Sequence, residues 1–384
     1  MNDSALGLLC GDARTFHHEV WASRVHLHHA EPHDLVGLLS LDDVDHLLTG
    51  SALRTPALRI AQDGSLVPAS RFTRSATMAG APVTGLVDAR KVLDLFESGA
   101  TVVLQGLHRY HPPLTRLVRQ LELELGHPCQ ANAYLTPPGA QGFARHSDIH
   151  DVFVFQTHGR KQWEVVDPAS PGFPDGPARE VLLEPGLSMY LPTGTPHSAR
   201  SQEETSLHVT IGINRVTMRD LVRSLTERVL AGTDYDAPLP SGWVDDPEVL
   251  AKSLADPLAA AAASLSSLDP VSVANSRADG FLSDRAPALA GGLVDRVVLG
   301  SLSDESLVER RSTAACVLRV DSDRLVVHLG DRSLRLPMRL RPVMEHVRGT
   351  DSFAVSDLAP WLDASGRLVL VRRLVREGLL RIVR

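Results

Sequence analysis

The stretch Gln130-Ala-Asn-Ala-Tyr-Leu-Thr-Pro-Pro-Gly-Ala-Gln-Gly-Phe-Ala-Arg-His-Ser-Asp148 decides the fold of this chain of 384 residues. It opens with the alternation of a β-strand, turns at Pro-Pro-Gly and ends in His146-Ser-Asp148. Side chains at positions i and i+2 of a strand point to the same side. We therefore expect the His146 imidazole and the Asp148 carboxylate to face one metal ion.

A second stretch supplies the third ligand, because a His-x-Asp pair alone says little in a chain with seventeen histidines. Gly186-Leu-Ser-Met-Tyr-Leu-Pro-Thr-Gly-Thr-Pro-His197 predicts a strand, a tight turn and another strand that starts at His197. Gly186 and Gly194 stand where turns need a positive φ, and a proline fixes φ between them. Two histidines and one carboxylate form the facial triad of non-haem Fe(II) oxygenases, which leaves coordination positions open. The pattern indicates a metal-binding cupin barrel.

Lysine is rare in this chain, which makes Lys161 noticeable. Of thirty-nine basic residues only Lys91, Lys161 and Lys252 are lysines. Lys161 lies on the alternating stretch 159–166, which predicts a strand after a turn at His158-Gly159. Its stem could carry an ammonium into the barrel toward a carboxylate. The alternative is a surface lysine whose stem lies along apolar surface.

Three segments carry a family resemblance: Asn132-Ala-Tyr-Leu-Thr-Pro-Pro-Gly-Ala-Gln-Gly142, His146-Ser-Asp-Ile-His-Asp-Val-Phe-Val-Phe-Gln156 and Gly159-Arg-Lys-Gln-Trp163. Together they resemble the JmjC-type ribosomal oxygenases of the cupin-4 group. Ser147 departs from the pattern, since many members carry an aromatic residue there. It points away from the metal, so we expect little effect on catalysis.

The resemblance implies a role for each site residue. His146, Asp148 and His197 would bind Fe(II) and be catalytic, and O₂ would be a cosubstrate. Lys161, fifteen positions after the first histidine, would hold the distal carboxylate of 2-oxoglutarate. Asn132 and Tyr134, on one face of the preceding strand, would line the pocket for 2-oxoglutarate and substrate.

The implied fold is α+β, with a double-stranded β-helix (cupin/JmjC) core. We expect this oxygenase domain and its N-terminal helical layer over 1–215, a helical connector that forms a homodimer over 216–284, and a winged-helix-like domain over 285–384. The implied enzyme is an Fe(II)- and 2-oxoglutarate-dependent dioxygenase that hydroxylates an arginine or histidine side chain of a ribosomal protein.

Two other functions remain open. A hydroxylase of a small molecule or peptide natural product would use the same site, since a fold does not fix the substrate. A ligand-sensing cupin regulator would use the C-terminal domain to bind DNA. That domain holds seventeen arginines and twelve acidic residues, but they are interspersed and form no basic run, which argues against nucleic acid as a partner.

Composition bounds the class of protein. The length suggests two or three domains, and 43% hydrophobic with 22% charged residues is typical of a globular chain. A net charge of −7 gives no general reason to bind nucleic acid. Cys10, Cys129 and Cys316 are few and far apart, which favours reduced thiols in a cytoplasm. The first twelve residues lack the basic region of a signal peptide, and no apolar run is long enough for a membrane helix.

Periodicity places further elements along the chain. Strands are predicted at 57–62, 100–106 and 207–213, and helices at 39–48, 88–99, 114–125, 218–230 and 246–268. The C-terminal part is predicted to hold a helix at 289–302, a hairpin at 324–336, helices near 342–347, 356–361 and 368–377, and a strand at 379–383. His208 and Thr210 share one side of the last barrel strand. His208 is either a fourth polar group of the pocket or a hydrogen-bonded core residue.

Overall fold

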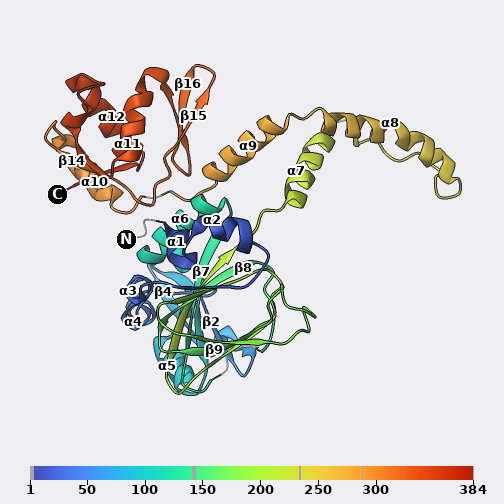
Figure 1. The fold of residues 1–384 in the computed structure, drawn as a ribbon, viewed down its shortest axis with the longest axis vertical. Helices are drawn as coiled ribbons and strands as arrows, with labels where there is room; N and C mark the ends of the chain where they lie inside the picture. Colours follow the sequence, from blue (N-terminus) through green and yellow to red (C-terminus); the bar gives the residue numbers. More distant parts are fainter. Residues whose placement is uncertain (1–3, 141–143, 233–234, 288, 384) are drawn as a thin grey trace. The chain divides into compact units, whose positions relative to one another are not determined.

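A computed structural model describes residues 4–140, 144–232, 235–287 and 289–383. Gln141, Gly142 and Phe143, inside the stretch that decided the fold, lie outside the described residues. The chain divides into two compact units, 1–215 and 216–384. Figure 1 shows the elements of both units.

The first unit is built on two antiparallel sheets. The larger sheet has the order β1 (His26–His29), β11 (Leu187–Leu191), β8 (Asp151–His158), β13 (Ser206–Ile213), β7 (Cys129–Thr136), β6 (Thr101–Leu104), β2 (Leu58–Gln62) and β3 (Ser65–Leu66). The smaller sheet has the order β10 (Arg179–Leu183), β9 (Lys161–Val165) and β12 (His197–Ser201). From β8 to β13, strands β8, β11 and β13 lie in the larger sheet and β9, β10 and β12 in the smaller one, so the chain crosses repeatedly between the sheets, as in a double-stranded β-helix.

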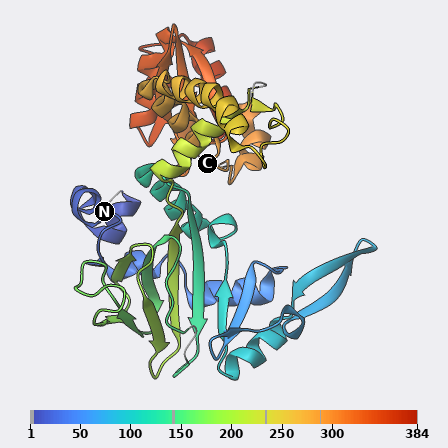
Figure 2. The ribbon, with the colours of Figure 1, turned by 90° about the vertical axis from the view of Figure 1, so that its right-hand side faces the viewer.

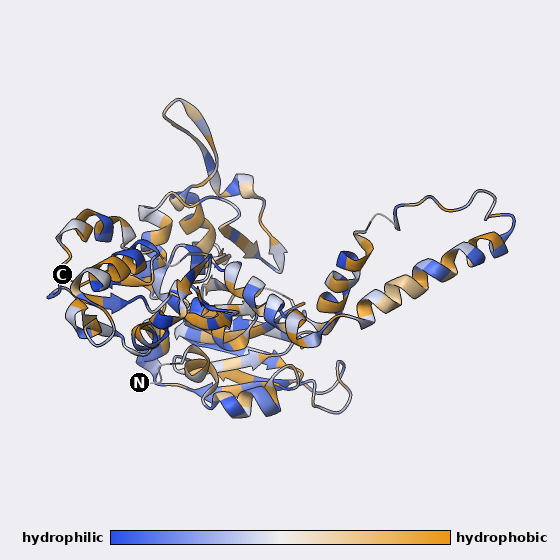
Figure 3. Ribbon diagram, turned by 90° about the horizontal axis from the view of Figure 1, so that it is seen from above, coloured by the Kyte–Doolittle hydropathy of each residue, from blue (hydrophilic) through white to orange (hydrophobic). Residues whose placement is uncertain are grey.

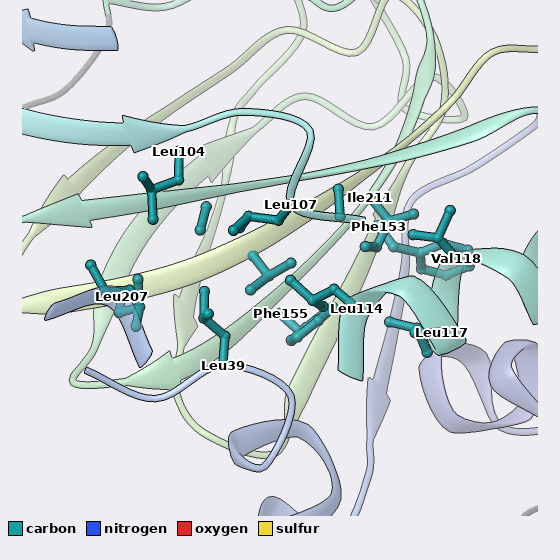
Figure 4. Packing of buried hydrophobic residues seen from close by; sticks show 14 of the residues in the cluster. Leu39, Leu104, Leu107, Leu114, Leu117, Val118, Phe153, Phe155, Leu207 and Ile211 are labelled. Carbon is teal, nitrogen blue, oxygen red and sulfur yellow. The ribbon is translucent and has the colours of Figure 1, made fainter. Parts of the chain in front are cut away.

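Helices cover one face of the larger sheet. Phe153, Phe155 and Ile211 alternate outward along β8 and β13 and pack against α6 (Pro112–Leu125), as the close-up in Figure 4 shows. The layer is completed by α1 (Ala5–Cys10), α2 (Ala13–Thr15), α3 (Pro32–Val36), α4 (Leu41–Gly50) and α5 (Ala89–Glu97). Ser40 caps α4 and forms a reciprocal capping box with Asp43, which satisfies backbone donors at the helix start.

The opposite face of the larger sheet turns toward the smaller sheet. Val152 and Val154 of β8 pack there with Trp163 and Val165 of β9 and Val181 of β10. The same alternation that sends Phe153 and Phe155 to the helices thus sends their neighbours into the barrel. The barrel interior can therefore present polar side chains only from every second position of each strand.

The turns predicted around the third ligand are confirmed. β11 ends at Leu191, and β12 begins at His197. Gly186 and Gly194 have φ of 98° and 83°, which side chains with a Cβ rarely adopt. The prediction for His146 and Asp148 was partly wrong, because they lie on no strand: His146 forms an isolated bridge with His197. The extended chain still turns both side chains toward one place.

Sequence reasoning missed a hairpin made of β4 (Thr73–Met78) and β5 (Ala81–Val87), which pair only with each other. Figure 2 shows this hairpin extending away from the sheet. Most of its side chains are exposed on both faces, so its sequence carries no in-and-out alternation.

The second unit begins with three helices: α7 (Met218–Leu230), α8 (Pro247–Ser266) and α9 (Pro270–Ser283). Only one of their residues, Leu282, is buried. Apolar residues recur along α7 and α8 in Figure 3. No helix in the described part of the chain is long and apolar enough to cross a membrane.

The rest of the second unit has its own hydrophobic core. Its helices are α10 (Gly292–Val298), α11 (Arg341–Gly349) and α12 (Ala364–Arg376). One three-stranded sheet has the order β18 (Ser352–Ala354), β14 (Leu307–Arg310), β19 (Leu380–Ile382), and the other has the order β15 (Val317–Asp321), β16 (Arg324–His328), β17 (Ser333–Pro337). The predicted hairpin at 324–336 is therefore part of a three-stranded sheet.

Candidate metal centre

His146, Asp148 and His197 form a cluster that can hold a metal ion. One ligand atom from each lies within 4.8 Å of the other two, and no other such cluster occurs among the described residues. The His197 Nε2 and Asp148 Oδ2 atoms are 3.7 Å apart. His146 is exposed, Asp148 is half-buried and His197 is buried, so the cluster opens on one side. An ion held there keeps coordination positions that small molecules can reach.

Backbone hydrogen bonds hold the ligands together. The His146 amide donates to the His197 carbonyl at 3.0 Å, and the His197 amide donates to the His146 carbonyl at 2.8 Å. The Gly194 amide donates to the Asp148 carbonyl at 2.9 Å. Ligands that are distant in sequence are thus fixed to each other by the main chain before any metal binds.

Both histidines are oriented for binding through the same nitrogen. Nδ1 of His146 lies 2.9 Å from the Ala144 carbonyl, and Nδ1 of His197 lies 2.9 Å from the Thr195 carbonyl. A carbonyl only accepts, so each Nδ1 carries the proton and each Nε2 is the nitrogen that can bind a metal. Burial also lowers the pKa of His197, with the neighbouring His146 adding to the shift. Both effects favour the neutral imidazole that a metal requires.

The cluster opens into a cavity of about 260 Å³ between the two sheets. The larger sheet contributes Arg59, Thr101, Tyr134, Val152, Val154, Leu191, His208 and Thr210, and the smaller sheet contributes Lys161, Trp163, His197 and Ala199. Asp148 is the one carboxylate among the lining residues. The cavity therefore combines a metal site with an excess of basic side chains.

Lys161 is buried inside this cavity, with 3% of its surface exposed, so the surface-lysine alternative is wrong. Its Nζ donates to the Thr136 hydroxyl at 3.0 Å, and the Thr101 hydroxyl donates to the same oxygen at 3.2 Å. Among the described residues no carboxylate forms an ion pair with it. Burial lowers the pKa of Lys161 to about 7. An ammonium in this position lacks the anion that would compensate its burial.

Tyr134 and Asn132 share a strand face but not a position in the cavity. Tyr134 lines the cavity, and burial raises the pKa of its hydroxyl. Asn132 is not a lining residue; its side-chain oxygen accepts a hydrogen bond from the Gly106 amide at 3.0 Å. A pocket role for Asn132 stays a prediction.

His208 faces the cavity from β13. Its ring stacks on that of Tyr134 at 4.8 Å and meets Trp163 edge to face at 5.5 Å. Its Nδ1 is buried and finds no hydrogen-bond partner among the described residues, which speaks against a hydrogen-bonded core histidine. Burial, with Lys161 and His197 nearby, lowers its pKa well below the usual value. His208 is therefore a neutral polar group of the pocket.

Sequence reasoning missed three polar residues of the site: Thr136, Thr101 and Arg59. Thr136 follows Asn132 and Tyr134 at period two, so the alternation of β7 could have found it. Thr101 and Arg59 come from β6 and β2, and only the pairing of these strands with β7 brings them to the site.

Comparison with known proteins finds similarity over part of the chain. Residues 107–221 match the model of the JmjC domain. Ribosomal oxygenase 1 of Danio rerio is 34% identical over 155 residues, which cover 36% of this chain and 28% of that protein. Ribosomal oxygenase 1 of Homo sapiens is 27% identical over 312 residues, covering 73% of this chain and 47% of that protein. The chain thus spans less than half the length of each of these two relatives.

Among solved structures, Escherichia coli ribosomal oxygenase YcfD matches with a TM-score of 0.56 and 18% identity, covering 97% of this chain and 98% of that chain. A structure of YcfD in complex with cobalt and 2-oxoglutarate matches with a TM-score of 0.53 and 17% identity. These likenesses establish the fold. Residues 107–221 thus match a JmjC domain, and the chain is similar in sequence to ribosomal oxygenases.

Proposed function

We propose that the chain is an Fe(II)- and 2-oxoglutarate-dependent hydroxylase that acts on an arginine or histidine side chain of a ribosomal protein. The observation that carries the proposal is Lys161, a buried base without an acidic partner, in the same cavity as the triad. A metal cupin without an anionic cosubstrate has no need for a cation there. The name of the related proteins supports the ribosomal substrate.

The residues present fit both groups. His146, Asp148 and His197 offer the nitrogen and oxygen donors that Fe(II) accepts, with their Nδ1 protons already committed to carbonyls. Lys161 would hold the distal carboxylate of 2-oxoglutarate, with the Thr136 hydroxyl beside it. Tyr134 and His208 would form the wall against which the cosubstrate and substrate lie.

When bound, iron supplies the oxidising chemistry: 2-oxoglutarate and O₂ react with a substrate C–H to give C–OH, succinate and CO₂. The protein positions the reactants and keeps water out with Val152, Val154 and Leu191. The test incubates the Fe(II)-loaded chain with ribosomal proteins and measures succinate and the mass of every tryptic peptide. A gain of one oxygen on a ribosomal peptide supports the proposal. Turnover that needs a small molecule from the extract would favour a natural-product hydroxylase, and absence of succinate would favour the regulator.

The affinity for 2-oxoglutarate should depend on pH through Lys161. Because burial lowers its pKa to about 7, the free protein loses the ammonium as the pH rises above that value. A carboxylate partner raises the pKa again, so binding takes up a proton and weakens about ten-fold per pH unit above about pH 7. Lys161→Arg stays charged, and its affinity should be nearly flat from about pH 7 to 9. Titration with 2-oxoglutarate at saturating Mn(II) measures both proteins. If the affinity for 2-oxoglutarate changed equally with pH in both proteins, Lys161 would not be the cause of the pH dependence.

For the second unit we propose the division made from sequence: a dimer-forming helical connector at 216–284 and a winged-helix-like domain at 285–384. Exposed apolar side chains on the connector support a second copy as its partner. Met218, Val222, Leu254 and Leu258 are 75%, 52%, 44% and 59% exposed. Exposed apolar side chains gathered on neighbouring helices are typical of a protein interface.

The dimer has its own test. Light scattering of the wild type at micromolar concentration should give about twice the chain mass. Replacing Val222 and Leu258 by Glu should give a monomer, because two charges would have to be buried at the interface. Lys252→Glu, which changes an exposed residue of the same helix α8, is the matched control and should stay dimeric. A monomeric wild type would remove the proposal.

A further inference from the structure

Arg59 is a charged residue of the cavity that has no role in the proposed binding of metal and cosubstrate. It lies on β2, which pairs with β6, which in turn pairs with β7. The register places Arg59 beside Val103, Val103 beside Tyr134, and Tyr134 beside His208. These residues form one row across the inner face of the larger sheet. Arg59, Tyr134 and Asp148 all line the same cavity.

The Arg59 side chain lacks a complete set of partners. Its Nε is buried and finds no hydrogen-bond acceptor among the described residues. A buried N–H donor without an acceptor costs stability, and a bound ligand can supply the missing acceptor. Lys161 stands in the same cavity and already has the Thr136 hydroxyl beside it. The two basic groups therefore have different roles.

The charges within the cavity indicate which kind of substrate side chain Arg59 can bind. This step rests on the proposed function. The charge of a divalent metal ion cancels that of the 2-oxoglutarate dianion, and the charge of Asp148 cancels that of Lys161. The Arg59 charge remains, and Asp148 is the one carboxylate among the lining residues. A guanidinium that enters this space would meet a like charge, whereas a neutral group with an acceptor atom would meet a free N–H donor.

We propose that Arg59 selects the substrate: its guanidinium donates to an acceptor of an uncharged target side chain, and it repels a cationic one. Of the two side chains open under the proposed function, this selects the neutral imidazole of histidine over the guanidinium of arginine. Arg59 acts as a specificity-determining residue, since it reads the substrate and takes no part in binding the metal.

The probes are overlapping synthetic peptides that tile the ribosomal proteins, tested at about pH 8, where free imidazole is uncharged. Mass spectrometry locates the added oxygen, which we expect on histidine. The peptide found is then made again with arginine at that position. Binding of both peptides is measured by fluorescence anisotropy without O₂, so that no turnover occurs. The arginine version should bind wild type at least about ten-fold more weakly.

Three variants test the residue itself. Arg59→Gln should bring the two peptides to within about two-fold of each other, because the like charge is gone. Arg59→Lys should keep the discrimination while the histidine peptide binds more weakly, since lysine lacks the Nε–H and the planar fork. Arg74→Gln, which changes an exposed arginine of β4 outside the cavity, should behave as wild type.

The outcomes separate this inference from the proposed function. Succinate with oxygen on arginine, or an unchanged peptide ratio in Arg59→Gln, overturns the role of Arg59 and leaves the hydroxylase intact. A loss of 2-oxoglutarate affinity in Arg59→Gln as large as the change in the peptide ratio would make Arg59 a cosubstrate ligand instead. Absence of succinate with every peptide, or of peptide binding, contradicts the proposed function as well.

Discussion

Replacing Lys161 by alanine should weaken 2-oxoglutarate binding by about thirty-fold to several thousand-fold. The substitution leaves the distal carboxylate buried without a cation, a loss that typically costs roughly 2–5 kcal/mol. The effect should be near the upper end of that range, because Lys161 is almost fully buried and its remaining neighbour, the Thr136 hydroxyl, carries no charge. The measurement is the dissociation constant of 2-oxoglutarate at saturating Mn(II), followed by tryptophan fluorescence.

Two comparisons make this result specific. Metal affinity should be unchanged in Lys161→Ala, because no ligand of the triad is altered. Lys161→Arg should bind 2-oxoglutarate better than the alanine variant, since a longer planar cation still reaches a carboxylate. Lys91→Ala alters an exposed lysine on α5 and is the matched control. Equal affinities across the three Lys161 proteins would mean that the cosubstrate has to be reconsidered.

His146→Ala, Asp148→Ala and His197→Ala should each abolish succinate formation. Each removes one of the donors that converge on a single point, and two remaining ligands rarely hold Fe(II) against water and buffer. Wild type should take up about one Fe(II) per chain, and each variant should lose most of it. Iron content by elemental analysis is measured beside succinate, so that loss of metal and loss of chemistry are seen separately.

His158→Ala is the matched control for the triad, since this exposed histidine ends β8 outside the cavity. It should keep iron and turnover near the wild-type values. Circular dichroism should show that all four variants fold, because His146 is exposed and none of the substituted side chains fills the hydrophobic core. A triad variant that kept near-wild-type turnover with bound iron would show that the ligand assignment is wrong.

Local pattern predicted the strands and the turn that carry the site, and the family resemblance assigned roles to the side chains on them. Alternation predicted a strand around Lys161 and one shared face for Asn132 and Tyr134, whereas the inward direction of Lys161 was implied by the family resemblance. The glycines before and after β11 fixed a turn that delivers His197 to the start of β12. In each case the decisive information lay within about ten residues of sequence.

The remaining features depend on pairing between distant segments. Arg59 reaches Tyr134 only through the register of β2, β6 and β7, which no local pattern gives. The exposed hairpin β4–β5 lacks the buried face that makes a strand visible in sequence. The helix α9 was missed because its apolar stripe is weak, although Asp269 before Pro270 is a typical start signal.

The bridge between His146 and His197 implies that the metal also stabilises the fold. Strands β8, β9, β10 and β11 all lie between Asp148 and His197, so the bridge closes a loop of chain that contains four strands of the barrel. An ion bound by these residues would hold the two ends of that loop together and stabilise the folded state, because the ligands are separated in the unfolded chain. Without iron, the strands of this loop would then unfold more readily and become accessible to proteases. Iron supply would set the lifetime of the chain as well as its turnover.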